Sequence, residues 1–161
     1  MFFLSGRTYM AAQCLDSDEY EAIPIEHDKL QFKPLKGECW LVDLGDTHGD
    51  VMNKYRPCVV VSENRFNVYS NCVTVVPITH APCRRRTHTY IKNETLEGTA
   101  KAEQMRVISK LQLGKYICNM NRDVMMNISK GIAYHIFGDN VESCGENIVI
   151  KNDCKEELIH E

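Results

Sequence analysis

The sequence lacks a long apolar run. Its hydrophobic stretches are short and strand-like, and none approaches the roughly 20 residues that a helix needs to cross a bilayer. The apolar start at residues 1–4 is cut off by Ser5, Gly6 and Arg7, and no basic segment precedes it. We therefore expect no signal peptide, no membrane association and a cytoplasmic location. Internal repeats and low-complexity tracts are also absent, which argues against a solenoid or a repeat array.

The spacing typical of metal ligands is missing too, although cysteine is abundant. The eight cysteines contain no CxxC pair, so neither a structural metal nor a cofactor is expected. Cys39, Cys58 and Cys72 fall within apolar strand patterns, where a free thiol acts as a small hydrophobe. Without a secretion signal, reduced thiols are expected. A disulfide between Cys144 and Cys154 stays open as an alternative.

Charge is distributed unevenly along the 161 residues, whose hydrophobic content of 43% suffices for one packed domain. Residues 36–138 carry 14 Lys and Arg against 9 Asp and Glu, whereas residues 1–35 carry 3 against 6 and residues 139–161 carry 2 against 7. This pattern predicts a basic core between an acidic N-terminal and an acidic C-terminal extension. A basic core can attract phosphate, and the acidic ends either dock on it or only aid solubility.

The apolar periodicity predicts several strands followed by one helix. A turn-rich connection is expected over residues 62–71, and Pro77 is expected to end its strand or to form a bulge. Helix signals are clearest over residues 121–137, with Asn121 as N-cap and Gly138 as the stop. Its apolar face comprises Val124, Ile128, Ile132 and Ile136. The expected strands cover residues 37–44, 56–62, 72–79, 87–93 and 98–107.

Two of these strands carry the most informative pattern. The segment RPCVVVS opens on Arg56, and VTVVPIT closes on Thr79. If the strands are adjacent, a guanidinium and a hydroxyl at their ends can grip one phosphate from two sides. Such an arrangement would suit RNA-backbone chemistry without a metal. The alternative is ordinary: a solvated arginine at a strand start and a threonine that caps a turn.

The core resembles the MazF/PemK (Kid) toxins of type II toxin–antitoxin systems. The resemblance rests on an ordered set of segments across residues 36–138. These are GECWLVDL, RPCVVVS, the N-x-x-S turn at Asn67, VVPIT, THTYI, EQMR and a helix ending at Phe137-Gly138. The family's common G-x-E-Q-G-G loop is replaced by GDTHGDVMNKY at residues 45–55.

This resemblance implies a mainly β fold with α, a small SH3-like or CcdB-like antiparallel barrel packed by a C-terminal helix. It implies a homodimer, a cognate antitoxin partner, and sequence-specific, metal-independent cleavage of single-stranded RNA (mRNA). The expected products carry a 2′,3′-cyclic phosphate and a 5′-OH. The alternative on the same fold is a non-catalytic binding module, either a degenerate toxin or a gyrase-inhibitor-like protein, and the altered loop supports it.

The resemblance also assigns catalytic residues. Arg56 and Thr79 match the family's RP and IT motifs, and Lys101 and Glu103 match the basic and acidic positions before its Q-x-R segment. Arg56 would stabilise the phosphorane, Thr79 would donate to it and Lys101 would assist as acid or electrostatic partner. Glu103, His48 and a water all remain candidates for the general base.

RNA contacts are expected from further side chains around this group. The Arg84–Arg86 run can bind phosphates, and Tyr55, Phe66 and Tyr69 either stack on bases or fill the core. His88 and His135 are interpreted as packing or surface residues. The full set of predicted RNA-binding residues is Arg84, Arg85, Arg86, His48, Tyr55, Asn67 and Gln104.

Overall fold

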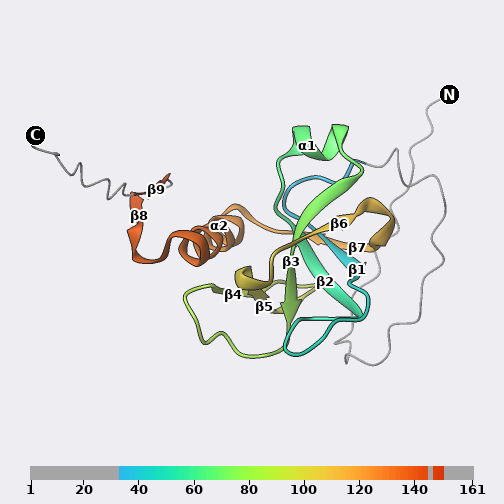
Figure 1. The fold of residues 1–161 in the computed structure, drawn as a ribbon, viewed down its shortest axis with the longest axis horizontal. Helices are drawn as coiled ribbons and strands as arrows, with labels where there is room; N and C mark the ends of the chain where they lie inside the picture. The colour runs from blue at the N-terminus through green and yellow to red at the C-terminus, as the bar shows by residue number, and fades with distance from the viewer. Residues whose placement is uncertain (1–32, 145–146, 151–161) are drawn as a thin grey trace, which may run out of the picture.

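A strongly bent antiparallel sheet forms the centre of the molecule. The structure is a computed structural model that describes residues 33–144 and 147–150 (Figure 1). Strands follow the spatial order β4-β5-β3-β2-β1-β7, and β6 pairs with β3. The bounds are β1 (Glu38–Asp43), β2 (Tyr55–Val60), β3 (Cys72–Thr79), β4 (His88–Lys92), β5 (Glu97–Lys101), β6 (Arg106–Ser109) and β7 (Leu113–Asn119).

Alternation along β2 and β3 divides the core between two faces of the sheet. Cys58 and Val60 face a cluster that also contains Trp40, while Val59 faces a second cluster. Because successive strand residues point to opposite faces, the run of valines is buried on both sides. These runs are therefore fully buried strands rather than half-exposed ones.

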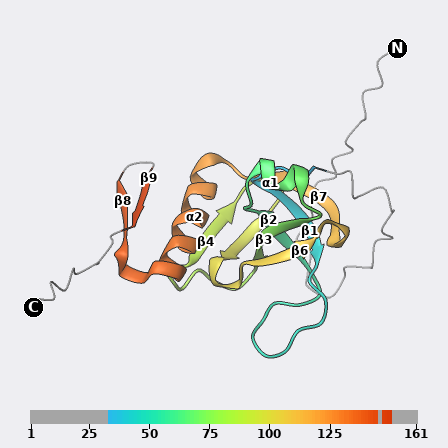
Figure 2. The ribbon, with the colours of Figure 1, turned by 45° about the horizontal axis from the view of Figure 1, so that its top comes forward.

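Helix α2 (Arg122–Phe137) packs against the second cluster through Val124, Met125 and Ile132, and Figure 2 shows it beside β4. The Asn121 side chain accepts a hydrogen bond from the Val124 N–H at 2.8 Å, and Gly138 ends the helix with φ +60°. Both predicted caps are therefore confirmed. Ile128 is buried, whereas Ile136 is 58% exposed because the apolar row runs past the edge of the sheet. Together with the sheet, this helix confirms the predicted fold class, mainly β with a packing helix. None of the described helices is both long and apolar enough to cross a membrane.

Gly131 allows α2 to approach the sheet closely. A Cβ atom at this position would lie 3.0 Å from the carbonyl oxygen of Thr87 and 3.3 Å from Cβ of Ala102. We expect Gly131→Val to lower the free energy of unfolding by about 1–3 kcal/mol through overpacking. Denaturant unfolding of this variant beside Asn127→Val, an exposed position on the same helix, measures the effect. If Gly131→Val and Asn127→Val lower the free energy of unfolding equally, close packing at Gly131 is not the cause.

Two strand predictions were wrong in detail, and both errors trace to β3. Pro77 neither ends the strand nor forms a bulge: it pairs with Cys58, and β3 continues to Thr79. On the edge of β3 away from β2, the partner changes at this proline from β6, which pairs up to Val75, to β5, which pairs from Ile78, so Pro77 lies where that ladder is interrupted. Residues 98–107 form two strands rather than one. A 3-10 helix, η2 (Ala102–Gln104), separates β5 from β6, which pair with opposite ends of β3.

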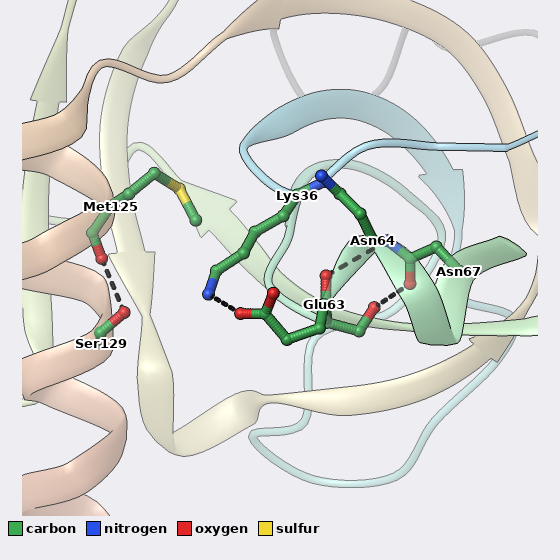
Figure 3. A network of polar contacts seen from close by, with 7 residues as sticks. Lys36, Glu63, Asn64, Asn67, Met125 and Ser129 are labelled. Carbon is green, nitrogen blue, oxygen red and sulfur yellow. Dashed lines mark hydrogen bonds and ion pairs between the residues drawn. The ribbon is translucent and has the colours of Figure 1, made fainter.

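The connection predicted to be turn-rich contains a short helix, α1 (Asn64–Tyr69). Lys36 secures its start, because the Lys36 backbone N–H donates to Asn64 Oδ1 at 2.7 Å and its ammonium pairs with the Glu63 carboxylate (Figure 3). Asn67 turns inward and bonds to Ser62 (Figure 3). The polar residues that had suggested turns therefore form hydrogen bonds that hold α1 in place.

After η4 (Gly138–Asn140), the strands β8 (Val141–Cys144) and β9 (Asn147–Ile150) form a separate hairpin beyond α2 (Figure 1). This hairpin lies within the segment that the sequence analysis assigned to the C-terminal extension. The hairpin, β7 and the 3-10 helix η3 (Lys110–Gln112) were not predicted. Most of the predicted N-terminal extension and Cys154 lie outside the described residues.

Five cysteines are free: Cys39, Cys58, Cys72, Cys83 and Cys118. Cys39 and Cys58 are completely buried, in line with their predicted role as small hydrophobes. Cys72 is exposed at the first position of β3, so that part of the prediction was wrong. The first residue of this strand lies outside the core, and the buried apolar pattern begins after it.

Candidate active site

Arg56 and Thr79 stand at neighbouring ends of β2 and β3. The β2–β3 pairing ends at Cys58 and Pro77, and Arg56 and Thr79 each lie two residues beyond that last pair, at the same end of the two strands. Directly opposed residues in an antiparallel pair project from the same face of a sheet. The guanidinium and the hydroxyl therefore share one face and one end of the sheet.

Both side chains keep hydrogen-bonding capacity for a ligand. Arg56 Nε donates to the Asn53 carbonyl at 3.2 Å, and its terminal nitrogens make no hydrogen bond to any described residue. Thr79 Oγ1 accepts from the Ala81 N–H at 3.3 Å, which leaves its own proton to donate. Each side chain is thus oriented by one contact and has donors left over for an anion.

β5 and β4 extend the same face. Thr79 pairs with Thr99, and Lys101 pairs with His88. Because side chains alternate along β5, Lys101 shares a face with Thr99 and so with Thr79. The sheet therefore sets two cations and a hydroxyl on one face of β2, β3 and β5, with Lys101 two residues along β5 from the partner of Thr79 and with His88 paired to Lys101 on β4.

Glu103, in η2, is turned into the protein. Its Oε1 lies 2.8 Å from His88 Nε2, and its Oε2 is buried without a hydrogen-bond partner among the described residues. Burial acts to raise the pKa of Glu103, but the nearby Thr87 hydroxyl, its own backbone N–H and His88 outweigh it, and the pKa is lowered. The carboxylate therefore stays ionised but points away from solvent.

His88 was interpreted from the sequence as a packing or surface residue, and the structure makes it the partner of Glu103. Its Nδ1 accepts from the Arg84 N–H at 3.2 Å. That contact fixes the neutral tautomer with the proton on Nε2, so Nε2 is the donor to Glu103. The sequence contained a signal for this position, because side chains alternate along β4 and His88 therefore projects from the sheet face opposite to that of Ile91. Among the described residues, no three His, Cys, Asp or Glu side chains are grouped so as to hold a metal ion.

The loop that replaces the family's usual one is anchored to η2. Gln104 Oε1 accepts from the Met52 N–H at 2.8 Å, and Gln104 Nε2 donates to the Asp50 carbonyl at 2.9 Å. Its amide is thus occupied in holding the loop, where the sequence analysis had predicted an RNA contact. His48 is exposed within the same loop.

Tyr55 precedes Arg56 in β2 and so projects from the opposite face of the sheet. It pairs with Asp43 in the β1–β2 ladder. Burial, and to a smaller extent the Asp43 carboxylate, raises the pKa of the Tyr55 hydroxyl. Phe66 and Tyr69 lie on α1, which follows the far end of β2. The three aromatic residues therefore do not gather around Arg56.

The three arginines of the basic run have different surroundings. Arg84 and Arg85 are exposed. Arg86 pairs with Asp139 at 2.9 Å, and its guanidinium lies 5.3 Å from the ring centre of Tyr134. Asp139 opens the predicted acidic C-terminal extension, so one residue of that extension contacts the basic run. Arg86 links the loop to the end of α2, whereas its neighbours are left to solvent.

Asn67 cannot serve as the predicted RNA contact, because it is 1% exposed and its side chain is fully engaged inside the protein. Its Nδ2 donates to the carbonyls of Pro34 and Ser62 at 2.9 and 3.2 Å, and its Oδ1 accepts from Ser62 Oγ at 2.6 Å. The N-x-x-S motif is therefore a folding element at the end of the sheet away from Arg56.

The chain matches a known protein family over most of its described length. A family model described as the PemK-like, MazF-like toxin of type II toxin-antitoxin systems matches residues 35–136. Endoribonuclease MazF9 of Mycobacterium tuberculosis is 29% identical over 111 residues, which span 63% of this chain and 94% of MazF9.

Solved structures support the fold. MazF from Deinococcus radiodurans superposes with a TM-score of 0.60 at 14% identity, over 65% of this chain and 97% of that one. An endoribonuclease in complex with its cognate antitoxin, from a mycobacterial species, gives a TM-score of 0.57 at 24% identity, over 64% and 94% of the two chains.

Proposed function

Because the chain belongs to the PemK-like, MazF-like toxin family of type II toxin–antitoxin systems, we propose that it is an endoribonuclease toxin. Its substrate is single-stranded mRNA cut at short sequences, which sets the activity in the cytoplasm. The named activity of its relative MazF9 supports this proposal. A cognate antitoxin would inhibit it, as the antitoxin complex of a structural neighbour suggests, and the active form would be a homodimer.

The observation that carries the proposal is the row of donors on one sheet face. Arg56 and Thr79 lie just beyond the last β2–β3 pair at the same end of the two strands, and alternation along β5 puts Lys101 on the same face as Thr99, which pairs with Thr79. Each of these groups has protons to donate, and two of them carry positive charge. Such a row suits a phosphate that gains negative charge during reaction.

The reaction would proceed by attack of the RNA 2′-OH on the adjacent phosphorus. The 2′-oxygen loses its proton and forms a bond to phosphorus, and the bond to the 5′-oxygen then breaks. Arg56 would bind two phosphate oxygens with its planar fork, and Thr79 would donate to the same group. Lys101 would supply positive charge or a proton to the leaving oxygen. The products are a 2′,3′-cyclic phosphate and a 5′-OH.

Glu103 is ionised, which a general base requires, but both of its oxygens face inward. Catalytic contacts often tighten only when substrate is bound, so the carboxylate would turn towards the 2′-OH on RNA binding. A water held by Glu103 and the exposed His48 are the two alternatives. His88 would hold Glu103 until that movement occurs.

Incubation of the purified protein with a mixed-sequence RNA in EDTA tests this function. We expect cleavage at a short recurring sequence, with fragments that accept a 5′-phosphate from a polynucleotide kinase without prior phosphatase treatment. Metal-independent attack by the 2′-OH leaves a free 5′-OH, which explains this result. Fragments that already carry a 5′-phosphate, or cleavage only after a divalent metal is restored, would contradict the mechanism.

The replaced loop favours a second candidate function, a non-catalytic binding module. Met52 is buried in the core, and Gln104 ties the loop to η2, so the loop at this face is built differently from the common family one. Measured RNA binding without any cleavage, in the same EDTA assay, would favour this candidate over the nuclease.

A further inference from the structure

Cys39 and Cys118 occupy opposed positions on neighbouring strands. They pair directly in the antiparallel β1–β7 ladder, beside a register shift between Cys39 and Trp40, and Cys118 packs against the buried cluster that contains Cys39. Opposed residues in such a ladder have Cα atoms about 4.5–5.5 Å apart. Disulfides span Cα separations of roughly 4.4–6.8 Å, so the backbone already meets their requirement.

The two thiols differ in their exposure. Cys39 is completely buried in the cluster beneath α2, whereas Cys118 is half-buried. Asn93, in the turn between β4 and β5, donates its side-chain N–H to Cys118 Sγ at 3.6 Å. Asn93 therefore directs a donor at the outer sulfur, and Cys39 lies opposite it on β1.

We propose that Cys118 and Cys39 form a reversible oxidation site, at which a peroxide converts the two thiols into a cross-strand disulfide. In the first step the Cys118 thiolate attacks a peroxide oxygen, the O–O bond breaks, and Cys118 sulfenic acid and hydroxide form. In the second step the Cys39 thiol attacks the Cys118 sulfur, the S–O bond breaks and water leaves. Peroxide takes the two electrons that the thiols lose, and a reduced thiol can reverse the reaction.

The electrostatics support this division of roles. Burial raises the pKa of Cys39, which therefore stays a thiol and can donate its S–H. The Cys39 thiol lowers the pKa of Cys118 to about 7, so Cys118 is more readily ionised at neutral pH than an ordinary cysteine. Cys39 is the ionisable group that acts on Cys118, Cys58 acts on Cys39, and the exposed Lys92 and Glu94 flank Asn93 in its turn.

Cys58 does not compete for the buried partner. Alternation places Cys58 in the core cluster on the opposite sheet face from Cys39. Cys72 and Cys83 are exposed, and neither is paired with a second cysteine in a strand ladder. Of Cys39, Cys58, Cys72, Cys83 and Cys118, the opposed pair Cys39 and Cys118 is therefore the one placed to form a disulfide.

Peptide mapping after brief peroxide treatment tests the proposal. The folded, reduced protein is treated with hydrogen peroxide, blocked with an alkylating agent and digested without reduction. We expect a peptide pair that joins Cys39 to Cys118 and lacks two hydrogens, and we expect dithiothreitol to release it. In Cys39→Ala, Cys118 should stop at the sulfenic acid, which dimedone traps. In Cys118→Ser, Cys39 should stay reduced.

Alkylation rates supply a second readout that requires no oxidation. The rate at Cys118 should rise with pH to half its maximum near pH 7, because the thiolate is the nucleophile. Loss of the donor in Cys39→Ala should raise this pKa towards the ordinary value of about 8.5, so the rate at pH 7 should fall about tenfold. Cys72→Ser is the control and should change neither result.

Oxidation that reaches Cys72 or Cys83 first, with no Cys39–Cys118 pair, would overturn the proposal. An unchanged alkylation profile in Cys39→Ala would do the same. If Cys39→Ala does not fold, Cys118→Ser still tests the proposal, because Cys118 is only half-buried. A disulfide formed by Cys39 in that variant would show that Cys118 is not its partner. Neither measurement depends on RNA cleavage.

Discussion

Arg56→Ala is expected to lower the rate of RNA cleavage about 10²–10³-fold, the usual loss when one preorganised donor to developing charge is removed. Arg56 carries a permanent charge, and its terminal nitrogens are not engaged by described residues. Single-turnover cleavage of a short RNA that contains the mapped site measures the effect. The cleavage rate of Arg56→Lys should lie between the rates of Arg56→Ala and of the unmodified protein, because lysine keeps the charge but loses the planar fork.

Arg65→Ala provides the matched control for that experiment. Arg65 is exposed on α1, at the other end of the β2–β3 pair, and its removal changes the net charge by the same amount. Its cleavage rate should remain within about twofold of the unmodified protein at moderate salt, since distant exposed charges are screened. Equal rates for Arg56→Ala and the unmodified protein would remove Arg56 from the mechanism.

Asn67→Ala is expected to destabilise the fold by about 2–4 kcal/mol, because a buried polar network loses its central member. The change removes both donors to the Pro34 and Ser62 carbonyls and the acceptor for Ser62 Oγ. The backbone carbonyl of Asn67 also accepts from the buried ammonium of Lys110, so the surrounding turn is disturbed as well. Urea unfolding followed by circular dichroism gives the free energy of unfolding.

Asn127→Ala is the corresponding control on the exposed side of α2. Alanine has a higher helix propensity than asparagine, so this variant should be unchanged or slightly more stable. A loss in Asn67→Ala no larger than that in Asn127→Ala would mean that the network at α1 contributes little. An intact fold with weakened RNA binding in Asn67→Ala would instead restore the RNA contact that the sequence suggested.

Several residues of the candidate site can be selected from the amino-acid sequence alone. Arg56 and Thr79 stand at the ends of two apolar strands, just beyond the last residues that pair β2 with β3. Lys101 and Glu103 come from the family resemblance and lie close together along the chain, in β5 and η2. The helix caps at Asn121 and Gly138 follow from local rules, since capping depends on residues within one turn.

Other residues were misjudged because their roles depend on distant partners. Asn67 and Gln104 were predicted to contact RNA, yet one is buried and the other ties down a loop over 50 residues away in sequence. Arg86 was grouped with Arg84 and Arg85, but Asp139 and Tyr134 at the end of α2 engage it alone. The role of His88 arises because η2 brings Glu103 against its ring.

By itself the sequence determined most of the central strands, helix α2 with its caps, and the family, because periodicity, capping and motif order are local properties; it missed α1, β7 and the β8–β9 hairpin. Strand order and register were decided only by the tertiary structure. They set His88 against Glu103 and Cys39 against Cys118, pairs separated by 15 and 79 positions along the chain. Alternation fixes the face of a side chain within its own strand, whereas the residue opposite it depends on how the whole sheet packs.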